Sequence, residues 1–315
     1  MSSVQFPQKL SLGIFPTPVQ YLENLSKILN IHLSIKRDDM TGVALGGNKV
    51  RKLEYLLYDA KQKGAEIVFT TGGAQSNHAM LTAACANKIG LTPILILKKK
   101  GVTDRKGNQL LESLMGTDVR FMDINSYDDI YEEMDRVGKA SGKPYYKIPC
   151  GGSNALGTIG YVECVKEMRD QGYTFDRIIC AEGSGGTMAG LALGAKLFMP
   201  SCRVTGMMVD TDPFDEITVR LMKEAAGILK ADIEISRSDF DLIDMCGPGY
   251  AIPSQEGNAA VALMAEKEGL FLDPVYTGKA FAGVIKLANE GAFKKDEKVL
   301  FLHSGGAGGL FALDM

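Results

Sequence analysis

Apolar segments of strand length alternate with helix-length segments along most of this chain. The run EIVFTTGG, which ends at Gly73, is followed by a helical pattern over residues 77–90, and a second apolar run covers residues 92–99. Short apolar strands separated by helices are typical of parallel sheets whose faces are both covered by helices. The same pattern predicts further strands at residues 118–123, 145–149, 176–183, 203–210 and 298–306, with helices at 108–116, 127–140, 157–170, 187–199 and 217–229.

The number of strand–helix units is larger than one open sheet usually holds. Roughly ten units are present, whereas sheets most often contain about four to six strands. A chain of 315 residues also exceeds the size at which a single hydrophobic core stops growing. We therefore predict an α/β protein with two open, twisted, mostly parallel sheets flanked by helices. Its ligand is expected in a cleft at the carboxyl ends of the strands.

Composition excludes several classes of function. A formal net charge of −3 gives no electrostatic basis for binding nucleic acid or an anionic membrane. No apolar run approaches the roughly 18 residues that span a bilayer, and the N-terminus lacks the pattern of a secretory signal. The six cysteines include no CxxC pair, and the three histidines have no metal-ligand spacing. We expect a cytoplasmic protein with reduced thiols and no metal site.

Four predicted strands are followed by loops rich in glycine, hydroxyl and amide side chains. These loops read GGAQSNH, CGGSNALG, GSGGTMAG and SGGAGG. Each loop alone is explained by a turn or a helix cap, but loops at the carboxyl ends of parallel strands converge on one cleft. GSGGTMAG, Gly183–Gly190, follows a strand and opens a helix. The backbone N–H groups at the start of a helix can bind an anion. Met188 breaks the dinucleotide fingerprint and no Walker motif is present, so a monophosphate is favoured.

The segment GGNKVRK, Gly46–Lys52, places three cations in what reads as the first turn of a helix. Cations there oppose the helix dipole. One interpretation is a solvated surface lysine; the other is that Lys49 is partly desolvated, lies beside other cations and has a lowered pKa. A neutral amine can attack an aldehyde, and Asn48 is suited to cap the helix. A reactive amine combined with a phosphate loop indicates pyridoxal 5′-phosphate (PLP).

Motifs spread over nearly the whole chain carry a family resemblance. GGNKVRKLEYLL, QSNH, IPCGGSNALG, GSGGTMAG, GPGYAIP, DPVYTGK and FLHSGG follow one another in the family's order. The chain resembles the D-cysteine desulfhydrase / 1-aminocyclopropane-1-carboxylate (ACC) deaminase family of fold type II, tryptophan-synthase-β-like PLP enzymes. The resemblance implies a large PLP-binding domain, residues 1–48 plus 162–315, and a small domain, residues 49–161. It also implies a cofactor in the cleft between them and a homodimer.

The resemblance assigns roles to individual residues. Lys49 matches the lysine that holds PLP covalently and moves the α-proton. Ser76 matches the hydroxyl that meets the substrate carboxylate, although a helix cap explains Ser76 or Asn77 equally well. Tyr276 matches the tyrosine stacked near the cofactor ring, and Tyr250 a second active-site tyrosine. The remaining expected cofactor contacts are Asn77, Gly183, Ser184, Gly185, Gly186, Thr187, Thr277 and Ser304, and the expected substrate contacts are Ser76, Asn77, His78, Gly152 and Ser153.

Two positions bear on the reaction. Ser304 matches the hydroxyl that faces the pyridine nitrogen, and a hydroxyl leaves the ring a weaker electron sink than a carboxylate would, which suits β-elimination. ACC deaminases have Glu after the stacking tyrosine, where this chain has Thr277. The resemblance therefore implies a PLP-dependent carbon–sulfur lyase acting on D-cysteine. Cysteate is the second candidate substrate and ACC is the third. A non-catalytic PLP-binding protein is the remaining alternative.

The family resemblance assigns no role to three charged residues. Arg51 and Lys52 are expected to face solvent or to pair with a distant carboxylate. Glu182 directly precedes the phosphate loop, where its charge would repel a phosphate. Its side chain is therefore expected to point away from the loop.

Overall fold

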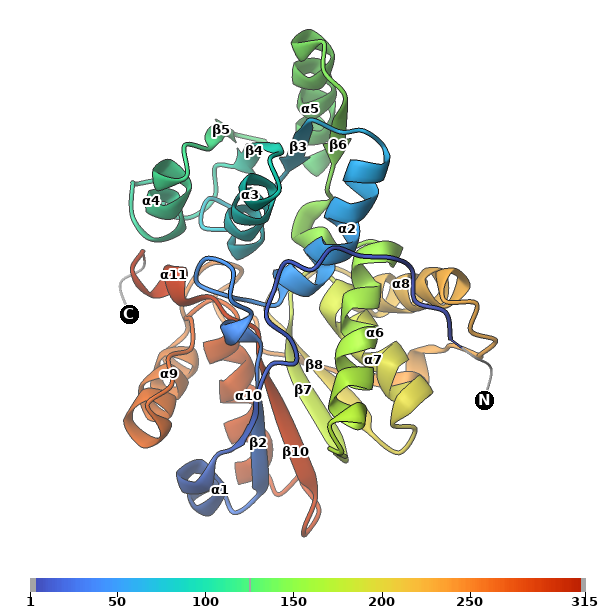
Figure 1. Cartoon of the computed structure of the whole chain (residues 1–315). Coiled ribbons are helices and arrows are strands. Elements are labelled where there is room, and N and C mark those ends of the chain that lie inside the picture. The colour runs from blue at the N-terminus through green and yellow to red at the C-terminus, as the bar shows by residue number, and fades with distance from the viewer. Residues whose placement is uncertain (1–3, 125, 313–315) are drawn as a thin grey trace.

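The computed structural model describes residues 4–124 and 126–312 and divides them into a larger and a smaller unit (Figure 1). The larger unit contains a six-stranded sheet in the order β1-β2-β10-β7-β8-β9. Strand β1 runs antiparallel to β2, and the other neighbours are parallel. Its strands are β1 Val19–Tyr21, β2 His32–Arg37, β7 Arg177–Glu182, β8 Arg203–Met208, β9 Phe240–Asp244 and β10 Lys298–His303.

Helices and short 3-10 turns accompany these strands. The α-helices are α1 Glu23–Leu29, α6 Ala155–Asp170, α7 Gly186–Phe198, α8 Phe214–Ile228, α9 Gln255–Glu268, α10 Thr277–Asn289 and α11 Ala307–Leu310, and the 3-10 turns are η1 Asp38–Met40, η2 Cys150–Gly152 and η3 Arg237–Asp239.

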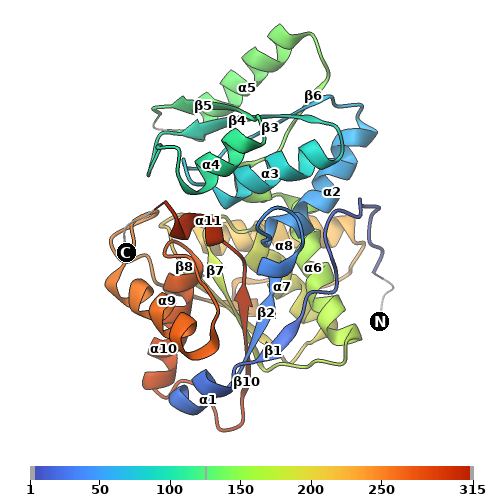
Figure 2. The ribbon, with the colours of Figure 1, turned by 60° about the vertical axis from the view of Figure 1, so that its left-hand side comes forward.

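The smaller unit contains a four-stranded, wholly parallel sheet in the order β5-β4-β3-β6. Figure 2 shows α3 and α2 on the side of this sheet that faces the larger unit, with α5 on the opposite side. The small unit is built from β3 Ile67–Thr70, β4 Thr92–Lys98, β5 Asp118–Met122 and β6 Tyr145–Lys147, with α2 Lys49–Gln62, α3 Asn77–Lys88, α4 Gly107–Leu114 and α5 Tyr127–Ser141.

Local sequence explains where these elements begin and end. All four residues of β3 are buried, as expected of a central parallel strand. Helix α5 starts after Ser126, whose hydroxyl accepts a hydrogen bond from the Asp128 backbone N–H, and ends at Gly142 in the left-handed conformation. The two-sheet α/β prediction is confirmed, and each predicted strand and helix is found within a few residues of its expected position. The domain boundaries remain a prediction.

Close helix packing fixes the position of the predicted phosphate loop. Helices α6 and α7 lie side by side in Figure 1 and share the main core cluster, which includes Tyr161, Val165 and Leu193. A Cβ atom at Gly190 would lie 2.4 Å from the Thr158 carbonyl oxygen, so only glycine permits this approach. The first turn of α7, which follows the loop, is therefore held against α6.

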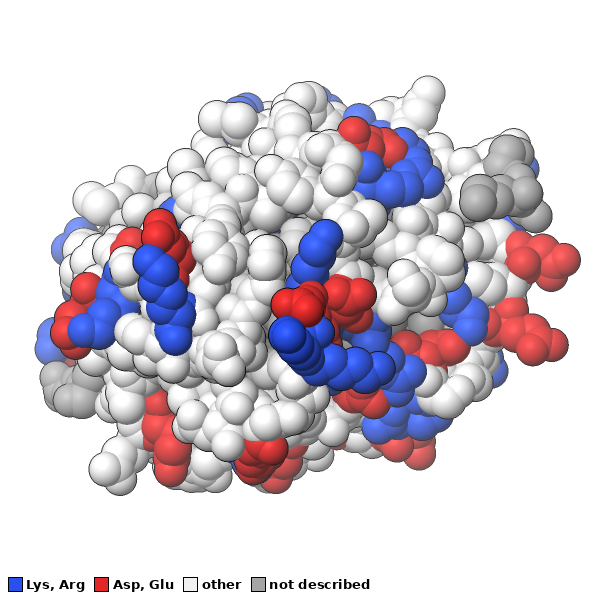
Figure 3. Space-filling model, turned by 90° about the horizontal axis from the view of Figure 1, so that it is seen from below, with Lys and Arg blue, Asp and Glu red and all other residues white. Residues whose placement is uncertain are grey.

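The face of the larger unit opposite the smaller one carries interspersed charges of both signs (Figure 3). At the amino ends of the strands, Arg203 pairs with Asp241 at 2.6 Å and Arg177 with Glu297 at 2.7 Å. Across the described ranges, no helix combines the length and apolar character that a bilayer crossing demands.

Candidate active site

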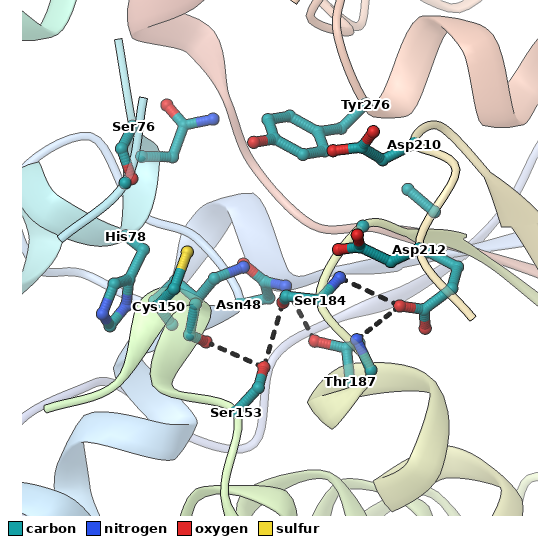
Figure 4. A pocket seen from close by; sticks show the side chains of 18 of the residues that line it. Asn48, Ser76, His78, Cys150, Ser153, Ser184, Thr187, Asp210, Asp212 and Tyr276 are labelled. Carbon is teal, nitrogen blue, oxygen red and sulfur yellow. Dashed lines mark hydrogen bonds between the residues drawn. The ribbon is translucent and has the colours of Figure 1, made fainter. Parts of the chain in front are cut away.

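The carboxyl ends of the strands surround a cavity of about 290 Å³ between the two units. All four glycine-rich loops contribute to its lining, through Ser76, Cys150, Ser184 and Ser304 among others, as the loop pattern predicted. Lys49 and the side chains of Tyr250 and Tyr276 also line it. In Figure 4, Ser76 and Tyr276 lie on one side of this cavity, and Ser153, Ser184 and Thr187 on the other.

The two glycines before Lys49 allow α2 to begin directly beside β10. Gly46 has φ +74°, and a Cβ there would lie 1.8 Å from the Asp39 carbonyl oxygen. Gly47 forms a bridge to Gly305, and the Asn48 backbone N–H donates to the Ser304 carbonyl at 3.0 Å. This contact brings the first residue of α2, Lys49, into the same cavity as Ser304.

Asn48 occupies the N-cap position of α2, but its side chain makes no capping hydrogen bond. Its Nδ2 donates to Thr187 Oγ1 at 3.0 Å, and its Oδ1 accepts from Lys49 Nζ at 3.0 Å. Burial lowers the pKa of Lys49 to about 8, against the raising effect of Cys150, Glu182 and Asp273. The predicted direction of this shift is confirmed, and so is desolvation as its cause, whereas the neighbouring cations that were also expected to contribute are not what lowers it.

Of the two alternatives expected for Arg51, pairing with a distant carboxylate is confirmed and a solvent-facing side chain is wrong, because Arg51 is buried in an ion-pair network. Its guanidinium binds both carboxylate oxygens of Asp38, at 2.7 and 2.9 Å, and both of Glu167, at 2.9 and 3.0 Å. The network joins α2 to the end of β2 and to α6, which is a structural role at the junction of the two units.

Neither alternative expected for Lys52 is right, because it is fully buried next to the phosphate loop and its hydrogen bonds go to a carbonyl and a hydroxyl. Its Nζ donates to the Gly151 carbonyl at 3.0 Å and to Ser153 Oγ at 3.2 Å. Burial, together with the charge of Lys49, lowers its pKa well below the ordinary value. An ammonium at this position would complement a phosphate group.

The predicted phosphate loop has the shape of a cradle, and the carboxylate of Glu182 lies in it. Gly185 has φ +86°, and a Cβ at Gly186 would lie 2.8 Å from both Lys52 Nζ and Ser153 Oγ. The prediction that Glu182 points away is wrong: its Oε1 accepts hydrogen bonds from the backbone N–H groups of Ser184 and Gly185. A buried carboxylate at the end of β7 finds there the donors that the start of α7 leaves free.

The QSNH segment forms the start of α3, one wall of the cavity. Ser76 is the N-cap, and its Oγ accepts from the Ala79 backbone N–H at 3.2 Å, which leaves the hydroxyl hydrogen for a ligand. Asn77 Oδ1 accepts from Asn108 Nδ2 at 2.8 Å, so the Asn77 amide can offer its N–H groups as donors. His78 is buried, and its Nε2 lies 2.8 Å from Thr70 Oγ1. Asn108 was not predicted, and no sequence signal marks it.

The two tyrosines meet at the cavity wall, with their hydroxyl oxygens 2.5 Å apart. Tyr276 precedes α10, and Asp273 accepts its backbone N–H at 2.9 Å. Lys279 of α10 is fully buried and donates to the carbonyls of Cys246 and Gly249, which hold the Tyr250 loop. The start of α10 therefore positions both tyrosines.

Thr277 is fully buried and is not among the residues that line the cavity. Its Oγ1 accepts from the Asp273 backbone N–H and donates to Asp273 Oδ1, each at 2.7 Å. Asp273 itself lines the cavity. Thr277 acts on the site through Asp273, because both hydrogen-bonding roles of its hydroxyl are satisfied there.

Several cavity residues were not predicted from the sequence. Two carboxylates, Asp210 and Asp212, follow β8 and lie near Tyr276 in Figure 4. Their position directly after an apolar strand was the available signal. Cys150 belongs to a loop that had been singled out only for its glycines and serine. Other unpredicted residues of the cavity include Tyr127, Tyr131, Arg220, Ile217 and Asp273.

These residues fit pyridoxal phosphate. The glycine cradle and Lys52 suit a phosphate, Lys49 supplies the amine, and the oriented Asn77 amide suits the ring oxygen. Gly152, in the left-handed region, lies against His78 and Lys52, and Ser153 hydrogen-bonds Ser184 at 3.0 Å. The individual cofactor and substrate contacts remain predictions.

Comparison with known proteins agrees with this geometry. The family model described as "Pyridoxal-phosphate dependent enzyme" matches residues 10–305. A D-cysteine desulfhydrase of Klebsiella pneumoniae is 41% identical over 98% of this chain and 96% of its own. A Thermotoga maritima protein provisionally named 1-aminocyclopropane-1-carboxylate deaminase is 42% identical over 96% of this chain and 98% of its own.

A solved structure described as an ACC deaminase homologue superimposes with a TM-score of 0.90 at 41% identity, covering 98% of this chain and 94% of that one. The tomato (Solanum lycopersicum) threonine deaminase isoform 2, at 16% identity and a TM-score of 0.65, covers 92% of this chain and 79% of that one and shares the fold alone. From its sequence, its fold and the contents of its cavity, this chain belongs to the pyridoxal-phosphate dependent enzymes.

Proposed function

We propose that this enzyme is a β-elimination lyase that converts D-cysteine and water to pyruvate, sulfide and ammonia. The observation that carries the proposal is the arrangement of one cavity. A partly buried lysine amine, a helix N-terminus with a free hydroxyl, and a pair of tyrosine hydroxyls all face it. The lysine amine can take the substrate's α-proton, the helix N-terminus and its hydroxyl can bind the carboxylate, and the tyrosine hydroxyls can face the leaving thiol. The related Klebsiella protein bears the name of this activity.

Different residues of the cavity act on different parts of the substrate. When bound, pyridoxal phosphate withdraws electrons from the substrate's α-carbon, which makes its proton acidic and lets the β-substituent leave. Lys49, with a pKa near 8, is a suitable base for that proton. Ser76 and the N-terminus of α3 hold the substrate carboxylate, because a helix start attracts anions.

The tyrosine pair faces the leaving group as an acid. Burial raises the pKa of Tyr250 and of Tyr276 above the ordinary value, so both phenols stay protonated at neutral pH. A departing thiolate carries a developing negative charge, which a protonated phenol stabilises through a hydrogen bond along which the proton can pass to sulfur. The 2.5 Å contact lets one tyrosine restore the proton that the other gives away.

The charges of the cavity favour a thiol over a sulfonate. Four carboxylate-bearing residues line it, Glu182, Asp210, Asp212 and Asp273, against two basic ones, Lys49 and Arg220. A cofactor phosphate adds further negative charge. A sulfonate on the β-carbon would therefore be repelled, whereas the thiol of D-cysteine is neutral at physiological pH. Cysteate remains the second candidate because its elimination uses the same groups.

A panel of substrates tests the proposal. D-cysteine, L-cysteine, both enantiomers of cysteate and ACC are compared by kcat/KM, with sulfide, sulfite, pyruvate and 2-oxobutyrate as products. We expect D-cysteine to give the highest value. A higher kcat/KM for cysteate would identify the enzyme as a cysteate sulfo-lyase. Efficient 2-oxobutyrate formation from ACC would overturn the elimination proposal.

Thr277→Glu is expected to lower D-cysteine elimination at least about ten-fold. The new carboxylate would lie in a fully buried position beside Asp273, and it would remove the hydroxyl that binds Asp273. Thr277→Ser, which keeps the hydroxyl, is the matched control and should retain most of the kcat. Unchanged turnover in Thr277→Glu would contradict the role given to Thr277.

Tyr250→Phe is expected to lower kcat by about a hundred-fold while the cofactor's visible absorbance is retained. The variant removes one hydroxyl of the pair and leaves the ring in place. Tyr173→Phe changes an exposed tyrosine far from the cavity and serves as the control. If Tyr250→Phe kept the kcat of the unmodified enzyme, the acid role would move to Tyr276 alone.

We further propose a cytoplasmic homodimer. The location is supported by the six cysteines, all free thiols and five of them buried. The dimer rests on the family resemblance. Light scattering on the purified holoenzyme tests it, with a mass of about twice the 34.0 kDa chain expected and a monomer contradicting it.

A further inference from the structure

Glu182 places a carboxylate inside the phosphate loop. It is the last residue of β7, and its side chain is 1% exposed. Oε1 accepts hydrogen bonds from the backbone N–H groups of Ser184, at 3.0 Å, and of Gly185. Glu182 also lines the cavity in which the cofactor fits.

The second carboxylate oxygen of Glu182 lacks such hydrogen-bond donors in the described ranges. In the described ranges, Oε2 of Glu182 is buried and makes no hydrogen bond. The charged groups of α2 that act on it are Lys49 and Lys52, and the thiol of Cys180 lies on its own strand. A buried carboxylate with one unsatisfied oxygen is held in a costly environment, so a competing ligand can displace it.

The other polar groups of the loop are only partly occupied within the protein. Gly186 N–H donates to Ser153 Oγ at 3.2 Å, and Thr187 Oγ1 accepts from Asn48 at 3.0 Å. The Thr187 hydroxyl hydrogen stays available to a phosphate at the start of α7, but the backbone N–H groups of Ser184 and Gly185, which belong to the same set of donors, are both held by Glu182. Two anions on the same donors, in a buried site, repel each other strongly.

We propose that Glu182 is an internal competitor for the cofactor phosphate and sets how tightly this enzyme holds pyridoxal phosphate. Its carboxylate occupies the Ser184 and Gly185 donors when no phosphate is bound and leaves them when the phosphate binds. Part of the phosphate's binding free energy is spent on moving this carboxylate. The proposal depends on the cofactor and not on the substrate.

Equilibrium dialysis of the full-length holoenzyme against decreasing cofactor concentrations measures the effect. Glu182→Gln keeps the size and removes the charge, and we expect its dissociation constant for pyridoxal phosphate to fall about ten-fold or more. Pyridoxal, which lacks the phosphate, should bind Glu182→Gln and the unmodified chain equally. Asp212→Asn, which removes a charge from the same cavity away from the loop donors, should change the cofactor affinity less than three-fold, an expectation of about 0.6 kcal/mol at most.

Unchanged or weaker cofactor binding by Glu182→Gln would overturn the proposal and show that Glu182 only stabilises the loop. An equal gain for pyridoxal would also overturn it. A crystal structure of the unmodified holoenzyme provides a test that does not depend on a variant. Glu182 Oε1 should have left Ser184 N and Gly185 N, and a carboxylate still bound to both would overturn the competition. Because no amino acid is present, a wrong substrate assignment leaves these results unaffected.

Discussion

Lys49→Ala is expected to reduce D-cysteine elimination by at least about 10³-fold and to abolish the visible absorbance of covalently held cofactor. Lys49 is the first residue of α2, its amine has a pKa of about 8, and the cavity holds the phosphate loop and tyrosine pair beside it. The substitution removes both the covalent anchor and the base. Stopped assays of pyruvate and an absorbance spectrum of the purified protein measure the two effects separately.

Borohydride reduction of the unmodified holoenzyme identifies the lysine directly. Peptide mass spectrometry should find the pyridoxyl group on Lys49 and not on Lys52, three residues further along α2. Lys27→Ala changes an exposed lysine of α1 and should leave turnover unchanged. A pyridoxyl group on Lys52, or full turnover by Lys49→Ala, would contradict the assignment.

Arg51→Ala is expected to lower the free energy of unfolding by about 3–5 kcal/mol, because it leaves the carboxylate of Asp38 buried without its main counter-charge. Asp38 is fully buried, and after the loss of Arg51 its partners are Thr17, Tyr161 and the nearby charge of Lys36. Urea unfolding followed by circular dichroism measures the change. A loss below about 1 kcal/mol would contradict the role of the network.

An exposed ion pair provides the comparison. Arg120 and Asp118 pair at 2.7 Å with side chains that are 40% and 43% exposed, so Arg120→Ala should cost less than about 1 kcal/mol. Burial alone would raise the pKa of Asp38, but Arg51 lowers it to about 2 from the ordinary 3.8. A lowered pKa adds stability that is complete above the ordinary value and is lost as the pH falls through about 2. The difference between the unmodified chain and Arg51→Ala should therefore be largest above the raised pKa that burial gives Asp38 once Arg51 is removed, and it should shrink as the pH falls from there to about 2.

The order of elements was predictable because it depends on local pattern. Buried parallel strands are short apolar runs, and helices between them start at Ser or Asn and end at Gly, so β3, α3, β4 and α5 were located from sequence. Strands β1, β2 and β9 and helices α1, α9, α10 and α11 were not predicted from the sequence. Strand β2, for example, reads HLSIKR, and its buried Lys36 has a partner far away in the chain, Glu167.

The candidate site was predictable to the level of loops, because the carboxyl ends of parallel strands meet at one edge. The cavity contains residues from all four predicted glycine loops, and Lys49 and the two tyrosines with them. Asn108 and Lys279 could not be found this way. They act by hydrogen bonds to Asn77 and to the Tyr250 loop, which lie about 30 residues away in sequence.

The sequence alone determined the alternating pattern, the glycine loops and the presence of a lysine at the start of a helix. It did so because each depends on neighbouring residues. Only the tertiary structure decided what happens to the charges around that lysine. Arg51 is neutralised by Asp38 and Glu167, Lys52 is buried against the phosphate loop, and Glu182 turns into that loop. A charged side chain is buried at low cost only where a hydrogen-bond or ionic partner lies beside it. Those partners come from η1, α6 and the loops before α6 and α7, which only folding brings together.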